Sequence, residues 1–288
     1  MTRQPTVKPL SLSALSLQLG ALAFGDDAGE KCLAIHGWMD NAASFTPLAT
    51  ALPECHVVSI DLPGHGLSTH LPEGCHYHLL DQVSYILAAA DALGWHQFNL
   101  LAHSLGACIA PFVAVAAPER ISRLVMVDGI GPPTESAEAL PARLKRSVAQ
   151  SAESRDRLTR IYSHMSDAVD ARLAATRMDR KNAELIVKRS LRETSGGFTW
   201  RFDSKIRLPS PSYLSTEQVQ ACLSSVACPS LLILAEQGVA QAREYAETRI
   251  GYMPRGVLYR LPGFHHVHMD HPDSVAAAVR RFFIHSAE

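Results

Sequence analysis

The chain has 288 residues, of which 47% are hydrophobic and 19% are charged, and its formal net charge is −1. This length suits one α/β domain that carries an insertion, or two small domains. Nothing in this charge balance resembles the basic face that a nucleic-acid-binding protein needs, and no like-charge run indicates disorder. Six cysteines without a C-x-x-C pair favour free thiols in a reducing compartment over disulfides.

The first predicted elements lie near the N-terminus. Residues 9–23 faintly resemble a signal peptide, but several polar side chains interrupt the apolar stretch. Its alternation of apolar and polar residues around one glycine predicts a β-hairpin. We therefore expect a cytoplasmic protein, since no other stretch approaches transmembrane length. The alternating residues are Leu15, Leu17, Leu19, Gly20, Leu22 and Phe24.

Short apolar runs then alternate with longer helical patterns along the chain. Apolar runs of this length predict strands that are buried on both faces. The alternation is the βαβ rhythm of a mostly parallel, doubly wound sheet, so we predict an α/β fold. The predicted strands are 31–35, 56–60, 98–102, 121–127, 230–235 and 256–261, and the predicted helices are 44–52, 78–94, 105–117, 240–250 and 272–285.

Residues 132–216 interrupt this rhythm and contain no convincing strand. They predict helices over 138–160, 166–178 and 180–193, followed by a loop that includes residues 196–200. An all-helical insertion after a strand is typical of a cap over a site at the carboxyl edge of a sheet. The predicted organisation is a core of residues 1–131 and 217–288 with a helical cap of residues 132–216.

The segment around Ser104 carries the strongest chemical pattern. A predicted strand runs directly into a predicted helix, and small residues, Ala102 and Gly106, lie two positions before and after the serine. This A-x-S-x-G sequence is a variant of the G-x-S-x-G nucleophile elbow, whose strained turn lifts the hydroxyl out of the sheet. A serine that caps an ordinary helix is the plainer alternative. The strand–turn–helix context favours Ser104 as the nucleophile.

A serine hydroxyl is a poor nucleophile until a base takes its proton. Four histidines follow the last predicted strand, and we expect His265 to be that base. Such a cluster also has to be weighed as a metal site. No group of Cys, Asp or Glu at metal-ligand spacing accompanies it elsewhere, so we expect neither a metal nor a cofactor. The remaining histidines, expected to be polar loop residues or supporting groups, are His266, His268 and His271.

An acyl-transfer site also needs two backbone N–H groups that stabilise an oxyanion. We expect one from Leu105, directly after the nucleophile, and the other from Trp38 in the loop after strand 31–35. Gly37 permits the tight turn of that loop. We expect His36, His103 and Trp200 to line the substrate pocket.

Together these motifs resemble the α/β-hydrolase superfamily from about residue 15 to residue 285. They are HGWMDN at 36–41, DLPGHGLS at 61–68, the Ser104 elbow and GFH at 263–265, in that order. The further segments YHLLDQV and MVDGIGP are similar to the serine hydrolase-like proteins of that superfamily. The resemblance implies the α/β-hydrolase fold, with the cap between its sixth and seventh strands, here 121–127 and 230–235. It leaves the substrate open, because this fold hosts many chemistries.

The acid that should orient His265 departs from the pattern of the superfamily. Most members carry it in a turn after the seventh strand, and Gly238 holds the corresponding position here. Asp128 follows the sixth strand, where haloalkane dehalogenase-like relatives can carry the acid, so we expect Asp128 to complete the triad. Glu236 is the alternative acid, and the lack of a working acid is a third possibility.

A nucleophile, a base and an oxyanion hole predict acyl transfer to serine and then to water. An esterase-like serine hydrolase acting on a small ester or other acyl substrate is therefore the leading hypothesis. The same residues also support carbon–carbon bond hydrolysis. The altered elbow and displaced acid keep open a small-molecule binding protein of hydrolase fold with little turnover. We expect no nucleic-acid partner and no membrane span, and both a monomer and a homodimer fit.

The predicted cap is rich in basic residues. Solvated helix faces explain them, and attraction of an acidic substrate is the alternative. We also expect an ion pair between Arg201 and Asp203 that ties the cap to the core. The basic residues are Arg172, Arg177, Arg180, Lys181, Lys188, Arg189 and Arg192.

Overall fold

A computed structural model describes residues 5–154 and 160–285 and contains an eight-stranded sheet in the order β1-β4-β6-β5-β7-β8-β12-β13. β4 is antiparallel to both of its neighbours, β1 and β6. The other six strands, β6-β5-β7-β8-β12-β13 in sheet order, are parallel to one another. The six strands predicted from apolar runs are all present, and the α/β fold is confirmed. The strands are β1 (Thr6–Val7), β4 (Ala21–Phe24), β5 (Glu30–Ile35), β6 (Cys55–Ile60), β7 (Phe98–His103), β8 (Ile121–Val127), β12 (Ser230–Ala235) and β13 (Gly256–Leu261).

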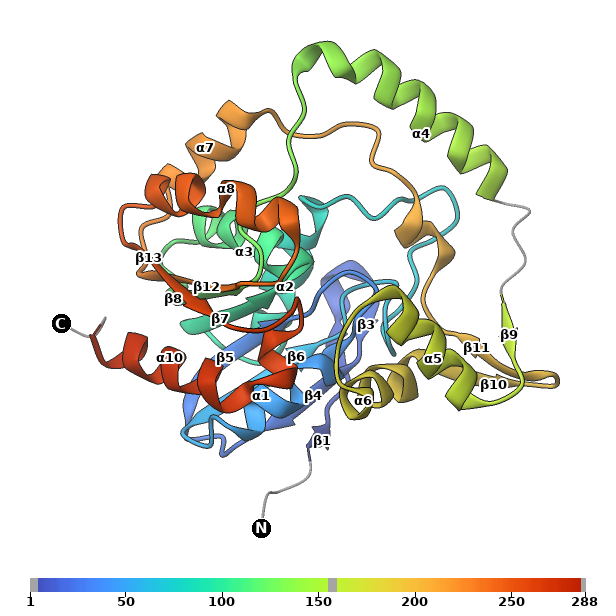
Figure 1. Cartoon of the computed structure of the whole chain (residues 1–288), viewed down its shortest axis with the longest axis horizontal. Helices are drawn as coiled ribbons and strands as arrows, with labels where there is room; N and C mark the ends of the chain where they lie inside the picture. The colour runs from blue at the N-terminus through green and yellow to red at the C-terminus, as the bar shows by residue number, and fades with distance from the viewer. Residues whose placement is uncertain (1–4, 155–159, 286–288) are drawn as a thin grey trace.

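Helices cover both faces of this sheet, and each face has its own apolar cluster (Figure 1). One face packs against α2 (Asp81–Ala92), α3 (Leu105–Ala116), α7 (Thr216–Ser224) and α8 (Ala240–Tyr252), and the other against α1 (Thr46–Thr50) and α10 (Pro272–His285). Strands buried on both sides are apolar throughout, which is why their sequences predicted them well. The sequence patterns did not predict α7 or the short α9 (Val267–Asp270). The predicted helix 44–52 corresponds to the end of a 3₁₀ helix, η2 (Ala42–Phe45), followed by α1.

The N-terminal strands pair differently from the predicted hairpin. β2 (Leu10–Leu12) and β3 (Leu17–Leu19) form their own two-stranded sheet, joined by a 3₁₀ turn, and their leucines are buried with α2. Pairing of Leu17 and Leu19 with Leu22 and Phe24 is therefore wrong. Gly20 instead joins strands of two different sheets, and a Cβ there would lie 2.5 Å from an oxygen of Asp61. Close approach, rather than a hairpin turn, explains this glycine.

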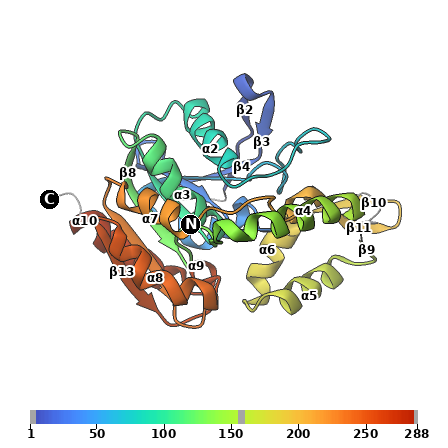
Figure 2. The same cartoon turned by 90° about the horizontal axis from the view of Figure 1, so that it is seen from above.

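Between β8 and α7 the chain leaves the sheet and forms a separate group of elements, here called the insertion. Its elements are α4 (Leu140–Ser154), β9 (Ile161–Tyr162), α5 (Met165–Ala175), α6 (Arg180–Ser190), β10 (Leu191–Thr194), β11 (Gly197–Trp200) and the 3₁₀ helix η4 (Ser204–Arg207). In both views α5, α6 and the three short strands lie together on one side of the core (Figures 1 and 2).

The prediction of an all-helical insertion is wrong, because β10, β11 and β9 form an antiparallel sheet. The predicted helix 180–193 ends at Ser190, and the predicted loop through 196–200 is partly strand β11. Gly197, the first residue of β11, has a φ of 125°, and Thr194 Oγ1 of β10 donates to its carbonyl. These strands are too short to show a clear period of two in the sequence. The end of the predicted helix 138–160 falls on 155–159, outside the described residues.

All six cysteines carry free thiols, as predicted. Burial raises the pKa of the Cys108 thiol to about 12, so this residue of α3 stays protonated. No helix within residues 5–154 and 160–285 is long and apolar enough to cross a membrane.

Candidate active site

Ser104 alone forms the turn between β7 and α3. Its backbone is strained, with φ at 50° and ψ at −110°. A Cβ at Gly106 would lie 2.2 Å from the Ile35 carbonyl oxygen, so only glycine fits there. The Ser104 side chain makes no capping bond to α3. The helix-cap alternative therefore does not describe this serine.

The structure brings Ser104, His265 and Asp128 into one chain of hydrogen bonds. His265 Nε2 lies 2.9 Å from Ser104 Oγ, and His265 Nδ1 lies 2.6 Å from Asp128 Oδ2. The Asp128 carboxylate is buried and also accepts the backbone N–H groups of Ala235 and Val239, each at 3.1 Å. These contacts hold the carboxylate against the imidazole, which is the arrangement that a Ser–His–Asp triad requires.

The alternative acid, Glu236, lies on the turn after β12 and is exposed. Its backbone carbonyl accepts from Arg243, and His265 Nδ1 contacts Asp128 instead. At Gly238, a Cβ would lie 2.3 Å from both carboxylate oxygens of Asp128. The Asp128 carboxylate thus fills the space that a side chain at 238 would need. This explains why glycine stands where the resemblance places the usual acid.

The two predicted oxyanion donors lie on segments that are hydrogen-bonded to each other, Trp38 in the loop after β5 and Leu105 at the start of α3. Gly106 N–H donates to the His36 carbonyl at 3.1 Å, which fixes the loop carrying Trp38 against the Ser104 turn. Within the described part of the chain, neither the Trp38 nor the Leu105 backbone N–H donates to another group. The Trp38 indole Nε1–H donates to the Ile206 carbonyl of η4 at 3.0 Å. Trp38 therefore links the core loop to the insertion.

Of the three predicted pocket residues, Trp200 lines the cavity, whereas His36 and His103 do not. Both histidines are fully buried. His36 Nε2 accepts the Leu62 N–H at 3.0 Å, and His103 Nε2–H donates to the His265 carbonyl at 2.9 Å. Burial lowers the pKa of His36 to about 4 and also lowers that of His103, so both rings are neutral. They hold the loops of the site in place.

Asp40 forms a buried charged network that the sequence patterns did not predict. It pairs with Arg172 of α5 and accepts from His266 Nε2 at 3.1 Å. Burial by itself would raise the pKa of Asp40, but the Arg172 guanidinium, with His266 and His103, brings this pKa well below its ordinary value. The ionised carboxylate joins the Trp38 loop, the histidine loop and the insertion. The only sequence signal was an acidic residue two positions after Trp38.

A metal ion at this network is not favoured by the charges around it. Asp40, His103 and His266 place ligand atoms within 4.8 Å of one another. The Arg172 guanidinium already neutralises Asp40, so a divalent cation would face a fixed positive charge. His268 belongs to the same buried group and packs its ring 4.1 Å from that of His103. We interpret the cluster as structural.

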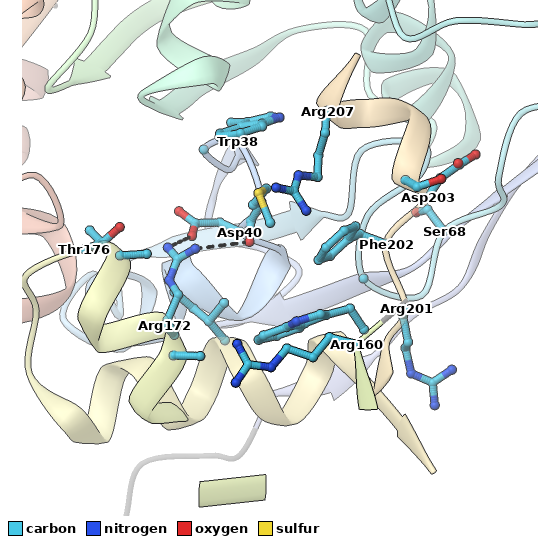
Figure 3. Close-up of a pocket in the computed structure, with 18 of the residues that line it drawn as sticks. Trp38, Asp40, Ser68, Arg160, Arg172, Thr176, Arg201, Phe202, Asp203 and Arg207 are labelled. Carbon is cyan, nitrogen blue, oxygen red and sulfur yellow. Dashed lines mark hydrogen bonds and ion pairs between the residues drawn. The ribbon is translucent and has the colours of Figure 1, made fainter. Parts of the chain in front are cut away.

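A cavity of about 1210 Å³ opens over Ser104 and His265, between the core and the insertion. Figure 3 shows side chains of both parts in its wall, such as Trp38 of the core and Arg207 of the insertion. Among the basic residues of the predicted cap, Arg172 and Arg192 line it, whereas Arg189 pairs with buried Asp61. The expected Arg201–Asp203 pair is replaced by other contacts. Arg201 Nε donates to the Leu191 carbonyl at 2.7 Å, and Asp203 accepts from the Tyr77 hydroxyl at 2.7 Å.

Known proteins resemble this chain over most of its length. A family model described as the alpha/beta hydrolase fold matches residues 33–237. The serine hydrolase-like protein of Danio rerio is 28% identical over 280 residues, covering 92% of this chain and 85% of that protein. The mouse protein of the same name is 28% identical, covering 90% of each chain. The crystal structure of a hypothetical protein from Pseudomonas aeruginosa PAO1 has a TM-score of 0.90 and 36% identity, covering 96% of this chain and 99% of that one. The chain therefore belongs to the α/β-hydrolase fold family and is similar to its serine hydrolase-like members.

Proposed function

We propose that this protein is a serine hydrolase that cleaves a small ester or other acyl substrate through an acyl-enzyme on Ser104. The observation that carries the proposal is the hydrogen-bond chain from Ser104 Oγ through His265 to Asp128, with distances of 2.9 and 2.6 Å. Ser104 and His265 border a cavity large enough for a small molecule. A hydrolase is consistent with the family, whose similar members carry the name serine hydrolase-like.

In the proposed reaction Ser104 Oγ attacks the substrate carbonyl carbon while His265 Nε2 takes the hydroxyl proton. Asp128 accepts the His265 Nδ1–H and stabilises the imidazolium. The Trp38 and Leu105 N–H groups stabilise the oxyanion of the tetrahedral intermediate. When the intermediate collapses, the bond to the leaving group breaks and His265 returns the proton to that group. Water then attacks the acyl-serine, with His265 as base, and the acid product leaves.

We further propose that residues 132–216 act as a cap on a core of residues 1–131 and 217–288. Both parts contribute to the cavity wall, with Trp38 and Ser104 from the core and Tyr162 and Trp200 from the insertion. Hydrogen bonds from Asn41 Nδ2 to the Ile186 carbonyl and to Ser190 Oγ, both 2.8 Å, fasten α6 to the core. The cap would therefore determine which acyl groups reach Ser104.

A fluorophosphonate probe and a series of p-nitrophenyl esters of increasing acyl length test this function together. We expect wild-type protein to gain one covalent adduct by intact mass, and Ser104→Ala to lose both labelling and esterase activity. Ser204→Ala is the matched control, because Ser204 lines the same cavity from η4 and is exposed. The rank order of the esters measures the size of the acyl site.

Full labelling of Ser104→Ala, or no labelling of folded wild-type protein with an accessible cavity, would contradict the proposal. The second result would favour a binding protein of hydrolase fold. Circular dichroism of each variant separates loss of chemistry from loss of folding.

A further inference from the structure

We infer that the substrate carries an anionic group, a carboxylate or a phosphate, which unpaired arginines of the cavity wall recognise. This inference rests on the proposed function, since it names the substrate class of the same site. Positive side chains outnumber negative ones around the cavity. Five arginines line it among the described residues, and only two carboxylates do.

Both carboxylates are already engaged by protein groups. Asp40 pairs with Arg172 and His266. Asp203 accepts from the Tyr77 hydroxyl at 2.7 Å and lies 3.5 Å from Lys205 Nζ. Neither is therefore free to neutralise the remaining arginines.

Two of the five arginines are held by protein groups, since Arg172 pairs with Asp40 and Arg201 Nε donates to the Leu191 carbonyl. The other three guanidinium groups have no carboxylate partner in the described parts of the chain. They belong to Arg160, Arg192 and Arg207, which are all exposed to the cavity or solvent. Figure 3 shows Arg207 extending from η4 toward the middle of the cavity, while Arg201 points away from it. The three come from different elements of the insertion, so the fold, and not one helix face, gathers them.

The position of Arg207 is fixed relative to the reacting groups. The Trp38 indole donates to Ile206, the residue before Arg207, and the Trp38 backbone is the proposed oxyanion donor. One short segment thus links the arginine to the oxyanion loop. A substrate whose acyl carbonyl reaches Ser104 can present a second, charged group to the guanidinium.

Arginine suits this role for two reasons. Its planar guanidinium offers parallel N–H donors that match the oxygens of a carboxylate or a phosphate. Several unpaired positive charges around one concave surface also raise the local concentration of anions. The aromatic side chains of Trp38, Tyr162, Trp200 and Phe202 line the rest of the wall and suit an apolar linker between the two ends of the substrate.

Two matched substrate pairs distinguish the possible anions. Mono-4-nitrophenyl glutarate and 4-nitrophenyl pentanoate share a five-carbon acyl group but differ in a terminal carboxylate. Butyryl-coenzyme A and butyryl-N-acetylcysteamine share the thioester but differ in the phosphates of the leaving group. We expect kcat/KM to be at least about tenfold higher for the anionic member of one pair than for its neutral partner. This ratio should fall as the NaCl concentration is raised, because salt screens the attraction between charges.

Arg207→Gln and Arg192→Gln test the residues. Loss of one charged hydrogen bond should lower kcat/KM for the preferred anion by about ten- to a hundredfold, and leave the neutral ester within about twofold. Lys188→Gln is the control, because it removes the same charge from an exposed position of the insertion outside the cavity. An equal effect of all three variants would overturn the inference.

Binding to Ser104→Ala protein keeps the two proposals separate. Glutarate or coenzyme A should raise its melting temperature, and Arg207→Gln should remove that shift. If neutral and anionic substrates react equally well in a Ser104-dependent way, and neither anion binds, the inference fails while the proposed function stands. If neither anion binds and no substrate reacts, both fail. If an anion binds but Ser104 is never acylated, the proposed function fails and the anion site stands.

Discussion

Two residues with strained backbones hold the candidate site together. Ser104 and Asp128 adopt φ values of 50° and 47° at the ends of the neighbouring strands β7 and β8. Parallel strands end at the same edge of a sheet, so these turns bring a hydroxyl and a carboxylate to the two sides of one imidazole. Strain of this kind persists only where the surrounding structure enforces it. Here hydrogen bonds on Asp128 and the close packing at Gly106 supply that enforcement.

Asp128→Asn should lower kcat by about 10,000-fold, because the amide would present an N–H or a poor acceptor to His265 and disturb its tautomer. The overall fold should survive, since the side chains are nearly isosteric. Steady-state kinetics with the best p-nitrophenyl ester and a thermal melt measure the two effects. Glu236→Gln is the control and should leave kcat unchanged. Wild-type turnover in Asp128→Asn, together with loss in Glu236→Gln, would transfer the role to Glu236.

Gly238→Ala should impair both catalysis and stability. The new Cβ would lie 2.3 Å from the Asp128 carboxylate oxygens, so the carboxylate must move away from His265. We expect kcat to fall by about a hundredfold and the unfolding free energy by about 1–3 kcal/mol. Gly251→Ala on α8 is the control, because a Cβ there meets no atom within 4 Å. That variant should keep its activity, and an equal loss of kcat in both would refute the explanation.

At the scale of elements, α6 fastens the insertion to the core. Arg189 of α6 bonds both oxygens of Asp61, which follows β6, and Asp61 is fully buried. Asp61 also accepts the backbone N–H groups of Ala42 and Leu67. One carboxylate thus joins η2, the loop after β6 and the insertion. This explains why a charged residue lies buried beneath the proposed cap.

Arg189→Met should lower the unfolding free energy by about 3 kcal/mol, because it leaves the buried Asp61 carboxylate without its counter-charge. Urea denaturation measures the change. Arg180→Met is the matched control, since Arg180 pairs with Asp170 at the surface, where their side chains are 55% and 60% exposed. Exposed pairs contribute little, so this change should stay within about 0.5 kcal/mol. Similar losses in both variants would show that Arg189 does not hold the insertion.

At the scale of the whole molecule, the interior contains several neutral histidines. Burial lowers the pKa of His36 and His266 to about 4 and that of His65 to about 3. These rings are uncharged in the folded protein at neutral pH. In the unfolded chain each would bind a proton below its ordinary pKa, about 6.5.

Stability should therefore fall as the pH drops below about 6.5. Between that value and pH 4 the unfolded chain binds more protons than the folded one, so acid favours unfolding. His36 alone corresponds to roughly 3 kcal/mol over this range. Urea unfolding at pH 7.5, 6.5 and 5.5 at constant ionic strength should show a small loss over the first interval, because histidines of the unfolded chain are half protonated at pH 6.5, and a larger loss over the second. Equal stability at pH 7.5 and 5.5 would contradict the buried neutral state.

The sequence by itself predicted the features that depend on local patterns. Apolar runs of about the length of a strand predicted the parallel sheet, and the residues around Ser104 predicted the elbow. Each of these signals lies within a few consecutive residues. The resemblance to haloalkane dehalogenase-like relatives also favours Asp128 over Glu236, and the hydrogen bond of His265 to Asp128 agrees with it. The catalytic roles themselves remain predictions that the kinetics above test.

Only the tertiary structure decided what depends on residues far apart in the chain. It revealed the insertion sheet, in which β9 pairs with β11 across a long stretch of sequence. It also moved His36 and His103 from the pocket wall into the buried interior. It also explained Gly238, because the Asp128 carboxylate that fills its space comes from a different strand. The excess of arginines over carboxylates around Arg207 also depends on residues that are far apart in the chain. Whether an arginine is paired depends on neighbours that the fold brings together, and local sequence patterns do not contain that information.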